Sequence, residues 1–263
     1  MIEELKEKIS DAELVLVGIG EEFEIRREEM TGNKTYARAF ADCENKKDYI
    51  PFIEKRFYEE CRDGAVLKRK ESYCKLAELL KGKNYFVITL CMDGLIRGTG
   101  LKQDRVAEPC GNYRKMQCCE KCTTDLYCRD EEAAALTAAI FSGFQKEADP
   151  AVPICPVCGR KLVFNNILAD HYAEEGYQEE WQLYRKWLQG TVNRKVCVLE
   201  LGAGMRFPTV IRWPFEKVVY FNRKAFMYRV HSRLYQVTQE IKERSLGVEA
   251  SPLEFLKRLS NEA

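Results

Sequence analysis

Short apolar runs alternate along this chain with longer stretches in which apolar residues recur at helical spacing. The runs at 14–18 and 85–90 are unbroken and carry β-branched or aromatic residues, as strands buried on both faces do. The stretch 50–61 instead places apolar residues three or four positions apart, which predicts a helix. Further strands are expected at 196–201 and 217–221, and helices at 2–10, within 34–80, and at 131–145, 172–188, 232–244 and 251–260.

This alternation predicts an α/β fold with a Rossmann-like, doubly wound parallel sheet. Three of the expected strands end in the turns GIGEE, CMDG and GAGM, and ligands of such sheets bind at the carboxyl ends of the strands. A cysteine-rich stretch interrupts the pattern. We therefore divide the chain into a Rossmann-like nucleotide-binding core over 1–90 and 196–263 and a cysteine-rich insert with flanking helices over 91–195. A helical part of the smaller domain is expected within 34–80.

Composition narrows the possible partners. The chain has 263 residues and a net charge of +1, which gives no electrostatic reason to expect nucleic acid. It has no run of 18 uncharged apolar residues, and its charged, helical start does not resemble a secretory signal. We therefore expect a cytoplasmic protein without a membrane partner. In a reducing compartment, its 12 cysteines are more often metal ligands or free thiols than disulfides.

Paired cysteines predict a zinc site in the insert. Cys155 and Cys158 form a CxxC knuckle, whose two thiolates can bind one tetrahedral Zn²⁺. The other two ligands come from Cys118, Cys119 and Cys122, and spacing alone prefers Cys119 with Cys122. Four thiolates would leave no open position, so this zinc-ribbon site would be structural. The alternative is a set of free thiols in the core.

Several segments resemble, in order, the motifs of the sirtuins, a family of NAD-dependent deacylases and ADP-ribosyltransferases. They are VLVGIGEEFE for the phosphate loop, FVITLCMDGL, GTGLKQDRVAEPCGN, CPVCGRKL for the second zinc knuckle, CVLELGAGMRFP, KVVYFN for the ribose-binding strand, and SLGVEASPLEFLKRL. LELGAGMRFP and IRWPFE are most similar to the branch linked to macrodomains in bacteria, which ADP-ribosylates proteins. The resemblance spans nearly the whole chain and implies the sirtuin fold, structural zinc, NAD or ADP-ribose as ligand, and a protein substrate.

The resemblance also implies site residues. It places cofactor binding at Gly18, Gly20, Glu22, Gly202, Gly204 and Asn222. It places the catalytic positions at Cys91, Asp93 and Cys110. The family's first zinc cysteine lies eight residues after its motif histidine, and eight residues after Cys110 is Cys118. The zinc ligands become Cys118, Cys122, Cys155 and Cys158, with Cys119 as the alternative to Cys118.

Several of these positions depart from the family pattern. Cys110 replaces the general-base histidine, and a thiol with a reference pKa near ~8.5 is a different base from an imidazole. Cys91 replaces the catalytic asparagine and lacks an amide's paired donor and acceptor. Glu22, beside Glu21, replaces the loop serine, and two carboxylates would weaken pyrophosphate binding unless both point away. The GAG turn at 202–204 lacks the hydroxyl donors of the family's Gly-Thr-Ser.

Each position also has a structural interpretation. Gly18 and Gly20 could simply end a strand tightly, and Asp93 could cap a turn. Cys91 and Cys110 could be ordinary buried residues, a redox-sensitive disulfide or, with Asp93, a second metal site. Two functions follow: an NAD-consuming transferase, or a catalytically degenerate sirtuin-fold protein that senses a nucleotide or docks a protein. Ordinary lysine deacetylation is the activity least expected, because it needs the proton relay most.

Overall fold

The centre of the fold is a six-stranded parallel sheet with the strand order β3-β2-β1-β6-β7-β8. The computed structural model describes residues 2–62, 64–143 and 151–261. The sheet strands are β1 (Leu14–Ile19), β2 (Asn84–Thr89), β3 (Val106–Ala107), β6 (Val196–Leu201), β7 (Ala225–His231) and β8 (Ser245–Glu249). All neighbouring strands are parallel. The chain leaves β1 toward one edge and later returns through β6 toward the other, so the strand order reverses between β1 and β6. Doubly wound folds bind ligands at that position.

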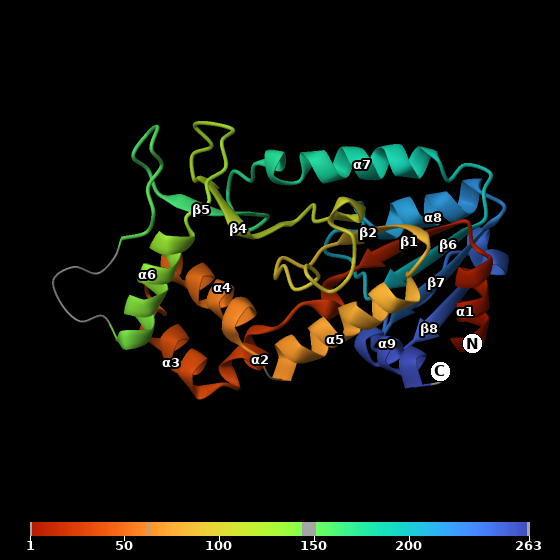
Figure 1. The fold of residues 1–263 in the computed structure, drawn as a ribbon, viewed down its shortest axis with the longest axis horizontal. Coiled ribbons are helices and arrows are strands. Elements are labelled where there is room, and N and C mark those ends of the chain that lie inside the picture. The colour runs from red at the N-terminus through yellow and green to blue at the C-terminus, as the bar shows by residue number, and fades with distance from the viewer. Residues whose placement is uncertain (1, 63, 144–150, 262–263) are drawn as a thin grey trace.

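Two layers of helices cover the two faces of the sheet (Figure 1). The layer helices are α1 (Ile2–Asp11), α5 (Gly64–Leu79) and α9 (Pro252–Asn261) on one face, and α7 (Gln178–Gln189) and α8 (Arg212–Phe221) on the other. Successive side chains of β1 point to opposite faces of the sheet and pack against both helix layers. Val15 and Val17 join the core beneath α1, α5 and α9, whereas Leu14 and Leu16 join the core beneath α7 and α8. This burial on both sides explains why the strand reads as an unbroken apolar run.

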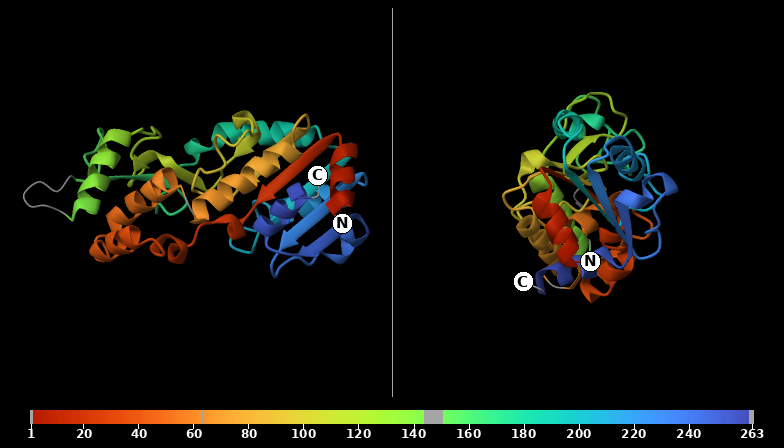
Figure 2. Two further views of the ribbon diagram at one scale, coloured as in Figure 1. Left: turned by 60° about the horizontal axis from the view of Figure 1, so that its bottom comes forward. Right: turned by 90° about the vertical axis from the view of Figure 1, so that its right-hand side faces the viewer.

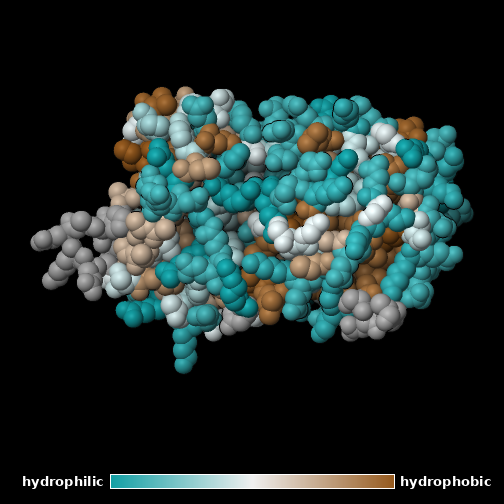
Figure 3. Space-filling model, in the orientation of Figure 1, coloured by the Kyte–Doolittle hydropathy of each residue, from teal (hydrophilic) through white to brown (hydrophobic). Residues whose placement is uncertain are grey.

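A small lobe extends from the sheet (Figure 2). It contains α2 (Arg27–Thr31), α3 (Lys34–Asp42), α4 (Ile50–Glu60) and α6 (Asp130–Ser142), with an antiparallel pair of β4 (Gly111–Cys118) and β5 (Leu162–Asn166). Tyr36 of α3 packs edge-on against Phe57 of α4 and Phe141 of α6, so helices from distant parts of the sequence share one core. Charged and polar residues cover most of the face drawn in Figure 3, with apolar residues in smaller patches.

Short 3-10 helices complete the described elements. They are η1 (Glu21–Phe23), η2 (Lys47–Tyr49), η3 (Gln103–Arg105), η4 (Glu174–Gly176) and η5 (Gln239–Arg244). Among the described residues, no helix combines the length and apolarity that crossing a bilayer requires.

The predicted α/β fold and the strands at 14–18, 85–90 and 196–201 are confirmed. The strand predicted at 217–221 is wrong, because these residues form the end of α8. Pro214 lies in the first turn of that helix, where its missing N–H costs nothing, and Phe215 and Val219 bury at helical spacing. The helix predicted at 232–244 is also wrong, since only η5 forms there before β8. Residues 144 and 145 of the helix predicted at 131–145 lie outside the described residues.

Gly18 explains how α8 approaches the sheet so closely. A Cβ atom at this position would lie 2.5 Å from Ile211 Cγ2 and 2.7 Å from Phe215 Cε2. We expect Gly18→Ala to lower the free energy of unfolding by about 1–3 kcal/mol, because this overpacked contact has to be relieved. Chemical denaturation measures the change.

Ile211→Ala provides the test of this cause. It removes the closer of the two clashing groups, so the Gly18→Ala/Ile211→Ala double variant should lose less stability than the sum of the two single variants. Simple additivity would contradict the packing explanation.

Candidate functional site

The carboxyl ends of β1 and β6 meet backbone to backbone at the reversal point of the sheet. Gly20 N–H donates to Leu201 O at 2.8 Å, and Glu22 N–H donates to Gly202 O at 3.2 Å. A Cβ atom on Gly20 would lie 2.1 Å from Ala203 Cα. Gly20 is therefore required for the contact between the two loops, whereas Gly18 lies one layer deeper, against α8. The floor of the predicted cleft is thus formed by two touching loops.

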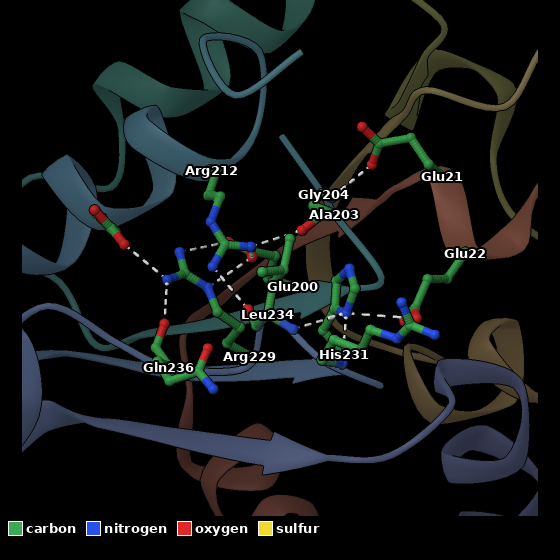
Figure 4. A network of polar contacts seen from close by, with 12 residues as sticks. Glu21, Glu22, Glu200, Ala203, Gly204, Arg212, Arg229, His231, Leu234 and Gln236 are labelled. Carbon is green, nitrogen blue, oxygen red and sulfur yellow. Dashed lines mark hydrogen bonds and ion pairs between the residues drawn. The ribbon is translucent and has the colours of Figure 1, made fainter. Parts of the chain in front are cut away.

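The loop after β1 directs two carboxylates onto the ends of β6 and β7. Glu21 accepts hydrogen bonds from Gly204 N at 2.5 Å and Arg206 N at 3.1 Å (Figure 4). Glu22 accepts from Ser232 N at 3.1 Å and from the Ser232 hydroxyl. The two side chains therefore do not point away from the strand ends. They occupy backbone N–H groups that would otherwise be available to an anion.

A buried ion pair supports these loops from below (Figure 4). Glu200 of β6 and Arg229 of β7 are each 1% exposed and form two hydrogen bonds, of 2.7 and 3.0 Å. Arg212 of α8 lies 3.6 Å from Glu200 and donates to Ala203 O and Leu234 O, both at 2.7 Å. One arginine therefore fixes the loop after β6 and the loop after β7 at the same time.

Asp93 lies just beyond β2 and is partly buried. Its Oδ1 accepts from Leu95 N at 2.8 Å, whereas its Oδ2 is buried and has no hydrogen-bond partner among the described residues. Burial raises the pKa of Asp93 to about 7 from an ordinary 3.8. Buried polar atoms are rarely left without a partner. Asp93 is therefore a carboxyl group that can exchange a proton near neutral pH and still has a free acceptor.

The two cysteines at motif positions are neutral thiols. Cys91 is buried, its Sγ lies 3.6 Å from Gly20 O, and burial raises its pKa well above the ordinary range. Cys110 is 4% exposed, and burial raises its pKa to about 12. Neither thiol is part of a disulfide. Among the described residues no second metal cluster includes them with Asp93. Cys110 therefore cannot act as an imidazole-like base near neutral pH.

Asn222 does not join the other predicted site residues. Its side-chain amide donates to Thr191 O at 3.0 Å and Arg194 O at 2.9 Å, just before the amino end of β6. The motif comparison placed Asn222 at a strand end because 217–221 resembled a strand. The strand of this unit is β7, which ends at His231, and Ser232 follows it. Assigning 225–231 as a strand from the sequence would have placed His231 and Ser232 at its carboxyl end.

Four sulfur atoms form a metal-binding cluster at the small lobe. The Sγ atoms of Cys118, Cys122, Cys155 and Cys158 all lie within 4.8 Å of one another. Cys118 and Cys158 are 3.5 Å apart, and Cys122 and Cys155 are 3.6 Å apart. A tetrahedral zinc site with Zn–S bonds of ~2.3 Å separates its sulfurs by roughly this distance. The donor set therefore fits structural zinc. Cys119 instead points to Glu120, so the structure selects Cys118.

Comparison with solved structures identifies the fold. A Sir2 protein in complex with the inhibitor EX-527, 2'-O-acetyl-ADP-ribose and deacetylated p53 peptide aligns with a TM-score of 0.61 and 16% identity, covering 99% of this chain and 98% of that one. Sir2Tm bound to a propionylated peptide aligns with a TM-score of 0.57 and 17% identity, over 99% and 98%. This chain has the sirtuin fold. The resemblance in the motifs is thus confirmed at the level of the fold.

Two curated relatives share a part of the sequence, and no family model matches it. A probable bifunctional ADP-ribose hydrolase/ADP-ribosyltransferase of Fusarium oxysporum f. sp. cubense is 31% identical over 142 residues, which are 52% of this chain and 24% of that protein. A protein ADP-ribosyltransferase of Staphylococcus aureus is 26% identical over 180 residues, which are 67% of this chain and 56% of that protein. The chain therefore matches only about a quarter and about half of these relatives' lengths.

The cluster geometry predicts different outcomes for two adjacent cysteines of this sirtuin fold. Cys118→Ser should lose most of the bound zinc, and it should destabilise the small lobe, because one thiolate ligand is missing. Cys119→Ser should retain zinc at the wild-type level. Atomic emission spectroscopy of both purified variants measures the metal, and equal zinc contents would contradict the ligand assignment.

The raised pKa of Asp93 predicts how stability depends on pH. The folded state holds the proton up to about pH 7, whereas the unfolded chain releases it near 3.8, so the folded protein loses stability as the pH rises through this window. We expect Asp93→Asn to remove this loss and to raise the free energy of unfolding at pH 8 by up to about 4 kcal/mol. At pH 4 the variant and wild type should differ little.

Urea denaturation at several pH values measures this effect. Asp11→Asn, at the exposed end of α1, is the matched control and should leave the pH dependence unchanged. A loss of stability in Asp93→Asn at pH 8 would contradict a raised pKa of Asp93 in the folded state.

Proposed function

We propose that this protein binds NAD or ADP-ribose at the carboxyl ends of β1, β2 and β6 and transfers ADP-ribose to a protein. The observation that carries the proposal is Asp93, which follows β2 and whose buried Oδ2 has no hydrogen-bond partner among the described residues. Within a sirtuin fold, this position lies where the family resemblance places the nicotinamide ribose. Both curated relatives are named as ADP-ribosyltransferases, which supports the reaction class.

The two ends of the nucleotide fit this cleft differently. The free acceptor of Asp93 suits a ribose hydroxyl, which can donate a hydrogen bond to it. The diphosphate end does not fit as the loops stand. The carboxylates of Glu21 and Glu22 already bind the N–H groups of Gly204 and Ser232. The proposed roles of Gly20, Gly202 and Gly204 are therefore to shape the cleft, and Asn222 has no part in it.

The properties of the thiols favour ADP-ribosyl transfer over deacylation. Cys110 holds its proton far above neutral pH, so the general-base step that the family assigns to this position has no acceptor here. ADP-ribosyl transfer depends chiefly on holding the ribose near an acceptor nucleophile, with nicotinamide as the leaving group. Asp93 can orient the ribose, and the buried Cys91 thiol holds the loop after β1 through Gly20 O. A protein acceptor and a cytoplasmic location, which suits thiolate ligands, complete the proposal.

A second candidate is nucleotide binding without turnover. Two observations favour it: both motif cysteines are neutral, and two carboxylates occupy the strand-end N–H groups. In that case the protein would be a sirtuin-fold sensor or docking module.

Nicotinamide release from NAD tests the proposal. We expect wild type to release nicotinamide and to label an acceptor protein from isotopically labelled NAD. Asp93→Asn should lower release by about 10²-fold or more, because the amide presents a donor or a weaker acceptor to the ribose. Glu78→Gln, exposed on α5, is the control and should match wild type.

The two candidate functions give different results in this assay. Absence of release with retained ADP-ribose binding in calorimetry would select the second candidate. Absence of both release and binding would overturn both functions.

A further inference from the structure

Backbone N–H groups at the ends of β6 and β7 donate to the carboxylates of Glu21 and Glu22. In doubly wound folds, backbone N–H groups that follow the strands at the reversal point bind the phosphates of nucleotides. Here the donors are the backbone N–H groups of Gly204, Arg206 and Ser232, together with the Ser232 hydroxyl. All of them already bind a carboxylate of the loop after β1. Glu21 binds the end of β6, and Glu22 binds the end of β7.

The nearby cation is also neutralised by the same loop. Arg206 forms a two-point ion pair with Glu24, with Nη1 to Oε2 at 2.9 Å. The three carboxylates of residues 21–24 therefore pair with three backbone N–H groups, the Ser232 hydroxyl and one guanidinium. An incoming diphosphate would meet donors that are taken and carboxylates that repel it.

Backbone packing fixes the positions of the loops that carry and bind Glu21 and Glu22. Gly20 touches the backbone of Ala203, and Gly202 accommodates Glu22, whose Cβ would lie 2.7 Å from a Cβ at that glycine. Arg212 fixes the carbonyl of Ala203 from below. The two carboxylates thus accept hydrogen bonds from loops whose backbone is fixed by other contacts, as a bound anion would.

We propose that Glu21 and Glu22 occupy the place of a ligand's diphosphate and determine the ligand specificity of the cleft. The free protein is complementary to a nucleoside without phosphates. It accepts a nucleoside diphosphate such as ADP-ribose only after both carboxylates leave their N–H partners. This inference rests on the proposed nucleotide site and deepens it, because it names the groups that control which ligand enters.

Equilibrium binding of two probes tests the inference. Calorimetry with ADP-ribose and with adenosine is carried out on wild type and on the Glu21→Ala/Glu22→Ala variant. We expect the variant to bind ADP-ribose at least about tenfold more tightly, because backbone N–H donors become free for the diphosphate and two negative charges are removed. Adenosine affinity should change less than about twofold, since adenosine carries no diphosphate.

Two further variants separate the causes. Glu21→Gln/Glu22→Gln keeps the side-chain acceptors but removes their charge, so its gain for ADP-ribose should be smaller than that of the alanine variant. It also keeps the side-chain size, and it carries the test if the alanine variant does not fold. Glu71→Ala/Glu78→Ala removes the same charge from the exposed surface of α5 and should bind both probes as wild type does.

The possible outcomes are distinct. Unchanged ADP-ribose affinity in the alanine and glutamine variants, or equal gains for ADP-ribose and adenosine, would overturn the inference. Failure of every variant to bind either probe would overturn it as well. If the proposed transferase activity fails, a selective gain in ADP-ribose binding would still support the inference. If wild type binds ADP-ribose tightly and the variants show no gain, the inference is overturned, but the transferase activity is not.

Discussion

The loops at the carboxyl ends of β6 and β7 depend on one buried ion pair, Glu200 with Arg229. The two residues lie opposite each other on β6 and β7, and both are almost completely withdrawn from water. Removing two charges from water is costly, and only close geometry and further hydrogen bonds offset that cost. The pair has both, since Arg229 also binds Glu216 at 2.7 Å and Gln236 O at 2.9 Å. Arg212 extends the network to the two loops, because it donates to Ala203 O and Leu234 O.

The sequence allowed the sheet to be predicted because its central strands are buried on both faces. A continuous apolar run is a local signal: β1 and β2 are largely apolar, and β6 begins with the apolar residues 196–199 before Glu200. β7 carries Arg229 in its centre, and β8 contains Gly247, so neither shows that signal. In contrast, the end of α8 contains two adjacent valines and looks like a strand. Its helical state is set by packing of Phe215 and Val219 on the sheet, which no local pattern records.

The sequence predicted which residues belong to the candidate site, but not which groups they contact. Spacing alone preferred Cys119 with Cys122, and the family resemblance replaced Cys119 with Cys118, which the structure places in the four-sulfur cluster. Asp93 followed from its motif. The partners of Glu21 and Glu22 lie 183 and 210 positions away, so only the folded chain shows where their carboxylates point. The expected position of Asn222 at a strand end came from one misassigned strand, and its amide instead lies near the amino end of β6.

The position of the four-sulfur cluster couples metal affinity to the packing of a helix. Cys122 precedes α6 and Cys155 follows it, 33 positions later, so a bound ion closes a chain loop that contains this helix. α6 buries Leu136 and Ile140 in the core that also receives Phe57 of α4. When the ion closes this loop, less conformational entropy is lost as α6 packs against the rest of the small lobe. Loss of the ion should therefore loosen α6 before the sheet melts, and heating the metal-free chain should give two separate transitions in place of a single cooperative one.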